Sequence, residues 1–83
     1  KGDRLDPESR VTIYDNTVQR EQCCHVGGSL AFDPQGNLYI SVGDNTNPFD
    51  SDFYSPNDPR PGRYPWDAQG TAANPNTTTG KIL

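Results

Sequence analysis

Long apolar runs are missing from this 83-residue sequence. Only 30% of its residues are hydrophobic, and no run approaches the roughly 18 apolar residues of a membrane-spanning helix. An excess of basic residues is missing too, since the net charge is −4 and the sequence pI is about 4.6. Because a nucleic-acid binder needs a basic face, this charge argues against nucleic acid as a partner, and the low hydropathy argues against a membrane span.

Residues able to form a core are also scarce. The hydrophobic share is below the roughly 45–50% apolar content of an average domain, and the chain contains 8 Pro and 8 Gly. A chain of this length buries only roughly 60% of the surface that its unfolded form exposes. The apolar ending Gly80–Leu83 resembles a strand that is just starting. We therefore expect residues 1–83 to be a fragment of one larger domain.

A sustained helical period is absent, so no long helix is predicted and the expected fold class is all-β. Residues 1–22 form a polar leading segment with one short β-prone run, Val11–Tyr14. A long Pro-rich loop is expected over residues 45–79, because loops of that length are uncommon unless they are functional or disordered. Residues 80–83 are expected to begin the next strand. Aromatic side chains within the loop favour one that packs onto other parts of the protein: Phe49, Phe53, Tyr54, Tyr64 and Trp66.

Residues 23–44 carry the clearest pattern of regular structure. The apolar run Ser29–Phe32 precedes Asp33-Pro34-Gln35-Gly36, in which Pro and Gly occupy positions that suit a tight turn. The run Asn37–Gly43 then alternates apolar and polar residues, as half-buried strands do. We predict an antiparallel hairpin in which the numbers of two opposed residues sum to about 69.

Cysteine spacing typical of structural zinc is absent, since the two cysteines, Cys23 and Cys24, are adjacent. Adjacent cysteines cannot join distant parts of this segment to each other. The alternatives are a vicinal disulfide, a pair of buried thiols, or partners outside the segment.

His25, the only histidine, follows the cysteines and precedes Gly27-Gly28. These glycines leave the backbone open to the close approach of a ligand, and an imidazole there can act as a general base near neutral pH. The alternative is a structural histidine at the start of a strand.

Asp44 follows Gly43 at the end of the second predicted strand. Because 25 and 44 sum to 69, the predicted register places His25 and Asp44 side by side. A carboxylate beside a histidine fixes its tautomer and makes it a stronger base, as in catalytic triads. The two residues are therefore a candidate catalytic dyad, and the alternative for Asp44 is an ordinary aspartate in a turn.

The run from Asp44 to Asp52 is rich in the oxygen ligands that calcium prefers. It lacks the glycine and glutamate of the EF-hand spacing, so a solvated loop is the alternative. No metal ligand is assigned.

The segment from Cys24 to Asp44 resembles the glucose/sorbosone dehydrogenase family, whose best-known members are soluble sugar dehydrogenases that depend on pyrroloquinoline quinone (PQQ). The segment reads Cys-His-Val-Gly-Gly-Ser-Leu-Ala-Phe-Asp-Pro-Gln-Gly-Asn-Leu-Tyr-Ile-Ser-Val-Gly-Asp. The ending Thr79-Gly80-Lys81-Ile82-Leu83 is similar to a strand that follows a long variable loop in that family. The resemblance covers about residues 20–83.

This resemblance implies a six-bladed β-propeller, of which the chain would form roughly one blade and a half. It implies that His25 is the general base that takes a proton from a sugar hydroxyl while hydride passes to PQQ, and that Asp44 pairs with His25. PQQ and calcium are the implied cofactors, with ligands mostly outside this segment, so no cofactor-binding residue is assigned. We expect the isolated fragment to be inactive, because a single blade cannot enclose a cofactor.

The cysteine pair and residues 59–67 are not features of the best-known members. They are similar to a bacterial subgroup found in large secreted proteins, which implies a periplasmic or extracellular location. The implied partners are the rest of the propeller, a sugar substrate, and a cytochrome or other electron acceptor. The alternative is a non-catalytic propeller that binds glycans or proteins, or a structural component of a larger extracellular assembly.

Overall fold

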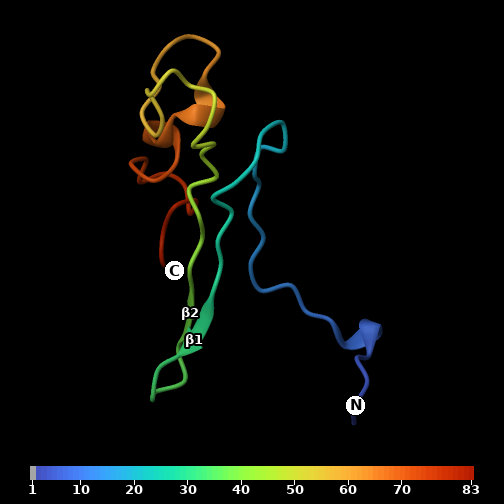
Figure 1. Cartoon of the computed structure of the whole chain (residues 1–83). Helices are drawn as coiled ribbons and strands as arrows, with labels where there is room; N and C mark the ends of the chain where they lie inside the picture. Colours follow the sequence, from blue (N-terminus) through green and yellow to red (C-terminus); the bar gives the residue numbers. More distant parts are fainter. Residues whose placement is uncertain (1) are drawn as a thin grey trace.

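The computed structural model describes residues 2–83, which form an elongated molecule with little regular structure (Figure 1). Its radius of gyration is 16.2 Å, whereas a compact domain of this length would have about 12 Å. The hairpin turn lies at one end and the long loop (residues 45–79) folds at the other end. Among residues 2–83, no helix is long and apolar enough to cross a membrane.

The predicted hairpin is present, and it consists of strands β1 (Leu30–Phe32) and β2 (Leu38–Ile40) in a two-stranded antiparallel sheet. The turn between them is closed by hydrogen bonds from Gly36 N to Asp33 O and from Asp33 N to Asn37 O, both 3.0 Å long. The carboxylate of Asp33 also accepts bonds from the backbone N–H groups of Gln35 and Asn37. An aspartate that binds the backbone N–H two residues on is a common stabiliser of tight turns.

The register of this sheet differs by one residue from the predicted register. Leu30 pairs with Ile40 and Phe32 with Leu38, so the numbers of opposed residues sum to 70 rather than 69. Gly36 explains the shift, because it has a φ of 87° and adds one residue to the far side of the turn. A turn followed by a left-handed glycine that forms a bulge is a usual connection in hairpins.

The two ends of the chain differ in whether they pair with the hairpin. Residues 80–83 lie along the free edge of β2: Ile82 forms a bridge with Ser41, and Leu83 and Ile40 exchange both backbone hydrogen bonds. The structure assigns no strand to Val11–Tyr14, however, and the leading segment contains only the short 3-10 helix η1 (Pro7–Ser9). Val11–Tyr14 runs beside no strand edge, so its β-prone residues have no ladder to join.

The long loop is ordered mainly by polar side chains. It contains the 3-10 helices η2 (Tyr64–Trp66) and η3 (Ala68–Gly70). Trp66 and Ala68 are the buried hydrophobic residues of the described chain, and the buried polar ones are more numerous: Asn45, Thr46, Asn47, Ser51, Asp58 and Thr79. No buried side-chain nitrogen or oxygen in residues 2–83 lacks a hydrogen-bond partner. The loop is therefore held by a satisfied polar network, which low-dielectric surroundings strengthen.

Asp58 lies at the centre of this network with a fully buried side chain. It accepts bonds from Arg60 Nε at 2.7 Å and from Arg63 Nε at 3.0 Å. The two guanidinium groups also lie over the rings of Tyr54 and Trp66, with their carbons 4.1 and 3.7 Å from the ring centroids. These hydrogen bonds, first of all those from Arg60, hold the pKa of the Asp58 carboxyl well below its ordinary range.

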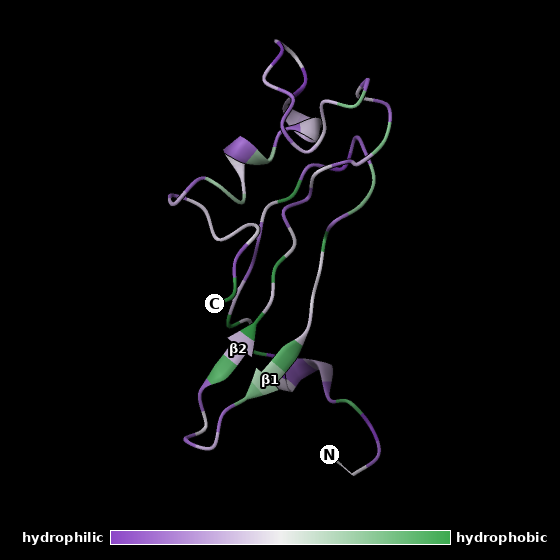
Figure 2. Cartoon of the chain, turned by 60° about the vertical axis from the view of Figure 1, so that its left-hand side comes forward, coloured by the Kyte–Doolittle hydropathy of each residue, from purple (hydrophilic) through white to green (hydrophobic). Residues whose placement is uncertain are grey.

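The hairpin leaves most of its apolar side chains uncovered. Leu30 and Phe32 of β1 are 67% and 72% exposed, and Ile82 beside β2 is 76% exposed. Figure 2 shows that the strands carry the hydrophobic residues, whereas the long loop is largely hydrophilic. The strands thus have regular structure without burying their apolar side chains.

Candidate functional site

The side chains of His25 and Asp44 lie in contact, as the sequence indicated. His25 Nδ1 is 3.1 Å from Asp44 Oδ1, and the side chains of His25 and Asp44 are 46% and 22% exposed. The same Asp44 oxygen accepts a bond from the backbone N–H of Thr46 at 3.0 Å. Asp44 is therefore held in place from its own loop, and its carboxylate is aimed at the imidazole.

Nε2 is the ring nitrogen of His25 that remains available to accept a proton. With Nδ1–H donating to Asp44, Nε2 carries the lone pair of the neutral ring. Within residues 2–83, no hydrogen bond is recorded for Nε2. The arrangement presents an oriented base at a partly exposed surface, which is the geometry that general-base catalysis requires.

The dyad (His25 and Asp44) is brought together because the backbone of residues 25–26 lies close to that of residues 43–45. The carbonyl of His25 accepts a 2.7 Å bond from Asn45 N, and that of Val26 accepts a 3.1 Å bond from Gly43 N. A Cβ at Gly43 would overlap the His25 carbonyl oxygen, so only glycine permits this approach.

The peptide that carries the base has an uncommon conformation. Cys24 and His25 have φ angles of 90° and 54°. Left-handed conformations cost non-glycine residues roughly 1–3 kcal/mol each and persist only where the surroundings enforce them. Cys23 and Cys24 form a vicinal disulfide, so the first of the alternatives left open by the sequence is the one present.

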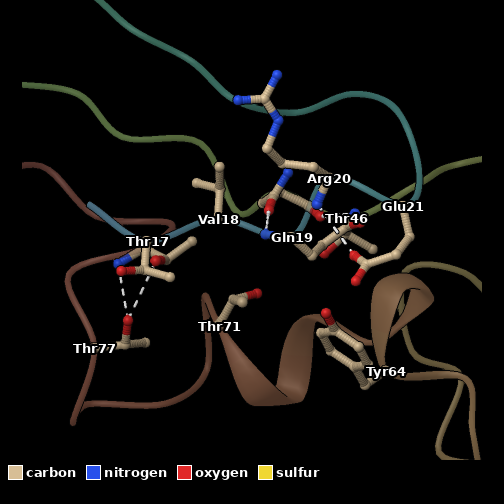
Figure 3. Close-up of a pocket in the computed structure, with 11 residues that line it drawn as sticks. Thr17, Val18, Gln19, Arg20, Glu21, Thr46, Tyr64, Thr71 and Thr77 are labelled. Carbon is tan, nitrogen blue, oxygen red and sulfur yellow. Dashed lines mark hydrogen bonds between the residues drawn. The ribbon is translucent and has the colours of Figure 1, made fainter.

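A cavity of about 480 Å³ with a mixed polar and apolar lining opens between the leading segment and the long loop. Its walls come from segments far apart in the sequence: Thr17, Val18, Gln19, Arg20, Glu21, Asn45, Thr46, Tyr64, Thr71, Thr77 and Thr79. In Figure 3 the side chains of Glu21, Tyr64 and Thr71 face one space, whereas the guanidinium of Arg20 points away from it. A lining of hydroxyls, an aromatic ring and few charges suits a neutral polyhydroxylated ligand.

Thr46 connects this cavity to the dyad. It lines the cavity, is 2% exposed, and donates its backbone N–H to Asp44. Asn45 also lines the cavity and binds the carbonyl of His25 through its own backbone N–H. The sequence alone did not indicate these cavity residues, because isolated threonines on separate segments have no spacing that distinguishes them from ordinary loop residues.

The oxygen-rich run from Asp44 to Asp52 uses its side chains within the protein. Asn45 Oδ1 accepts a bond from Gln19 N at 2.7 Å, and Asn47 Oδ1 accepts one from Phe49 N at 2.8 Å. Within residues 2–83, no group of three or more His, Cys, Asp or Glu side chains is placed to hold a metal ion. These residues do not form a calcium cage.

PQQ carries three carboxylates, so a site for this quinone requires cationic side chains. Arg60 and Arg63, the arginines of the long loop, both bind the buried Asp58. If these two guanidinium groups held a polyanion, their hydrogen bonds to Asp58 would be disrupted. The two arginines of the long loop therefore form no ready cradle for the quinone.

Comparisons of this chain with protein-family models, with curated proteins and with solved structures find no match.

Proposed function

We propose that this chain supplies the general base of a sugar dehydrogenase of the glucose/sorbosone type. The observation that carries the proposal is the contact between His25 Nδ1 and Asp44 Oδ1, which leaves Nε2 open. In the family that the sequence resembles, residues matching these two perform the same task. The proposed reaction is the oxidation of a sugar hydroxyl, in which His25 removes the hydroxyl proton.

Each residue of the dyad has a distinct role in this reaction. His25 accepts the proton at Nε2 and becomes an imidazolium, whose charge the Asp44 carboxylate stabilises across the 3.1 Å contact. Asp44 also keeps the ring turned so that Nε2 faces outward. Removing the hydroxyl proton prepares the sugar carbon to lose hydride, and positioned bases of this kind contribute about 10²- to 10⁴-fold to a rate.

The hydride acceptor in the resembled family is PQQ, which works together with calcium. Since no group of three His, Cys, Asp or Glu side chains in residues 2–83 is placed to hold a metal ion, and both arginines of the long loop bind Asp58, we propose that both groups are held by other parts of the full-length protein.

We further propose that the hairpin belongs to one blade of a β-propeller. The exposed side chains of Leu30, Phe32 and Ile82 support this architecture, because a blade buries such faces against neighbouring blades. The vicinal disulfide supports a periplasmic or extracellular location, since disulfides persist in oxidising compartments.

The test is dye reduction coupled to sugar oxidation by the full-length protein loaded with PQQ and calcium. We expect His25→Ala to lower kcat by about 10²- to 10⁴-fold. Gln35→Ala is the matched control, because this exposed polar residue lies in the hairpin turn, away from the dyad. Equal rates for His25→Ala and the wild type would overturn the proposal.

A non-catalytic glycan-binding function is the second candidate, and the cavity favours it because its threonine and tyrosine hydroxyls can bind a sugar without a base. In that case the wild type would bind an immobilised glycan array and show no dye reduction, and Tyr64→Ala would weaken binding while His25→Ala would not.

A further inference from the structure

The Cys23–Cys24 disulfide lies directly before the base in the chain. It closes a small ring that contains the peptide bond between the two cysteines, and such a ring restricts the backbone torsions on both sides of that bond. Cys24 and His25 have φ values of 90° and 54°, which non-glycine residues seldom adopt, although Asn45, Asp50, Asp52 and Phe53 also have positive φ values. The covalent ring and the uncommon backbone conformation thus occur at the same place.

Two asparagines fix the other side of this peptide. Asn45 Nδ2 is 3.5 Å from the Cys24 carbonyl, and Asn45 N donates to the His25 carbonyl. Asn47 Oδ1 lies 3.8 Å from Cys23 Sγ, and Asn47 Nδ2 donates to Gln22 Oε1 at 3.1 Å. Both asparagines are buried, so they form a fixed surface under residues 22–25.

We propose that the Cys23–Cys24 disulfide is a redox-sensitive positioning device, which holds the His25 imidazole against Asp44 when oxidised and releases it when reduced. The hydrogen bonds from Asn45 orient the carbonyl groups of Cys24 and His25, whereas the φ of Cys24 is a torsion of the disulfide ring itself. The disulfide is therefore the covalent restraint on this torsion. Without it, Cys24 is expected to return to the negative φ values that L-residues favour, which moves His25 and turns its imidazole away from Asp44.

The reductant is a dithiol, either a small molecule or a dithiol protein. One of its thiolates attacks Sγ of Cys23, whose residue is exposed, whereas Cys24 is partly buried. The Cys23–Cys24 bond breaks, and Cys24 leaves as a thiolate that takes up a proton. The second thiol of the reductant attacks the mixed disulfide and frees Cys23, so the protein gains two electrons and the dithiol becomes a disulfide.

The consequence for catalysis rests on the proposed function, but the positional claim does not. A misplaced base slows a reaction steeply, since an error of about 1 Å in position can cost about 10²-fold. In the sugar dehydrogenase proposed above, reduction would therefore switch off proton removal. The geometry can be tested without any enzymatic assay.

The experiment is long-range ¹H–¹⁵N NMR of the imidazole in the 83-residue chain, with and without dithiothreitol. His25 is the only histidine, so its ring signals are assigned directly, and Trp66, the only tryptophan, reports on the long loop through its fluorescence. In the oxidised chain we expect the pattern of a neutral ring protonated at Nδ1. On reduction, the signals should move to the positions seen in Asp44→Asn, while the Trp66 emission stays constant.

The control is the double variant Cys23→Ser/Cys24→Ser, which should give the reduced pattern with and without dithiothreitol. Identical ring signals in the oxidised and reduced wild type would overturn the proposal. A simultaneous change in Trp66 emission would also overturn it, because the disulfide would then hold the whole fold rather than the base. Neither result bears on whether His25 is catalytic, so failure here is distinct from failure of the proposed function.

Discussion

His25 and Asp44 meet through their side chains although the backbone places Asn45, and not Asp44, opposite His25. The Asn45 N–H donates to the His25 carbonyl, and the His25 ring reaches diagonally to the Asp44 carboxylate at 3.1 Å. The left-handed conformation of His25 makes this diagonal contact possible. The dyad therefore depends on an uncommon backbone geometry as well as on two suitable residue types.

Gly43→Ala tests whether the close approach of the two segments positions the base. The new Cβ would overlap the His25 carbonyl, and the atoms it meets are backbone, which cannot move aside cheaply. We expect sugar oxidation by the full-length protein to slow by about 10²-fold, as for a displacement of about 1 Å. Steady-state dye reduction measures this loss.

Gly70→Ala is the matched control, because nothing lies within 4 Å of a Cβ at Gly70. We expect its rate to equal that of the wild type. If Gly43→Ala were equally harmless, the approach of residue 43 to His25 would not matter for the base.

Asp58→Asn tests the polar network of the long loop. In the folded chain the pKa of the Asp58 carboxyl lies well below its ordinary value of 3.8, chiefly because of hydrogen bonds from Arg60 and then from Arg63. A depressed pKa stabilises the fold above the unfolded value, and this stabilisation is lost as the pH falls through the folded value. We therefore expect the wild type to lose stability below about pH 4, and Asp58→Asn to be less stable at pH 7 and less sensitive to acid.

Asp52→Asn provides the control, since Asp52 contacts Arg60 at 3.2 Å but is 81% exposed. Surface ion pairs contribute little, so its urea midpoint, followed by Trp66 fluorescence, should stay close to that of the wild type. Equal midpoints for Asp58→Asn and Asp52→Asn would contradict the role given to the buried carboxylate.

The hairpin was predictable because its signals are local. The sequence from Asp33 to Gly36 specifies the turn, and alternating residues specify the second strand. The register was missed by one residue, because a left-handed Gly36 lengthens one side of the turn and the number of residues in the loop does not reveal this. The predicted contact between His25 and Asp44 is nevertheless present, because His25, which precedes β1, has a left-handed backbone conformation.

The order within the long loop was not predictable from local pattern. Asp58 and Arg60 are close in the sequence, but burial of the carboxylate depends on the fold of residues 49–66, where Trp66 Nε1 donates to the Phe49 carbonyl. The cavity likewise joins Thr17 to Thr77, a pairing that arises from tertiary structure alone. Hydrophobic periodicity cannot indicate a loop whose interior is mostly polar.

The most direct test of the account is a double-mutant cycle on the dyad in the full-length protein, with kcat for sugar oxidation as the measured quantity. If Asp44 acts by orienting His25, then Asp44→Asn should reduce kcat strongly in the wild type and have almost no further effect in His25→Ala. The double variant should thus be about as slow as His25→Ala alone. Losses that multiply, or a His25→Ala variant with the rate of the wild type, would contradict the claim that these two residues form a catalytic unit.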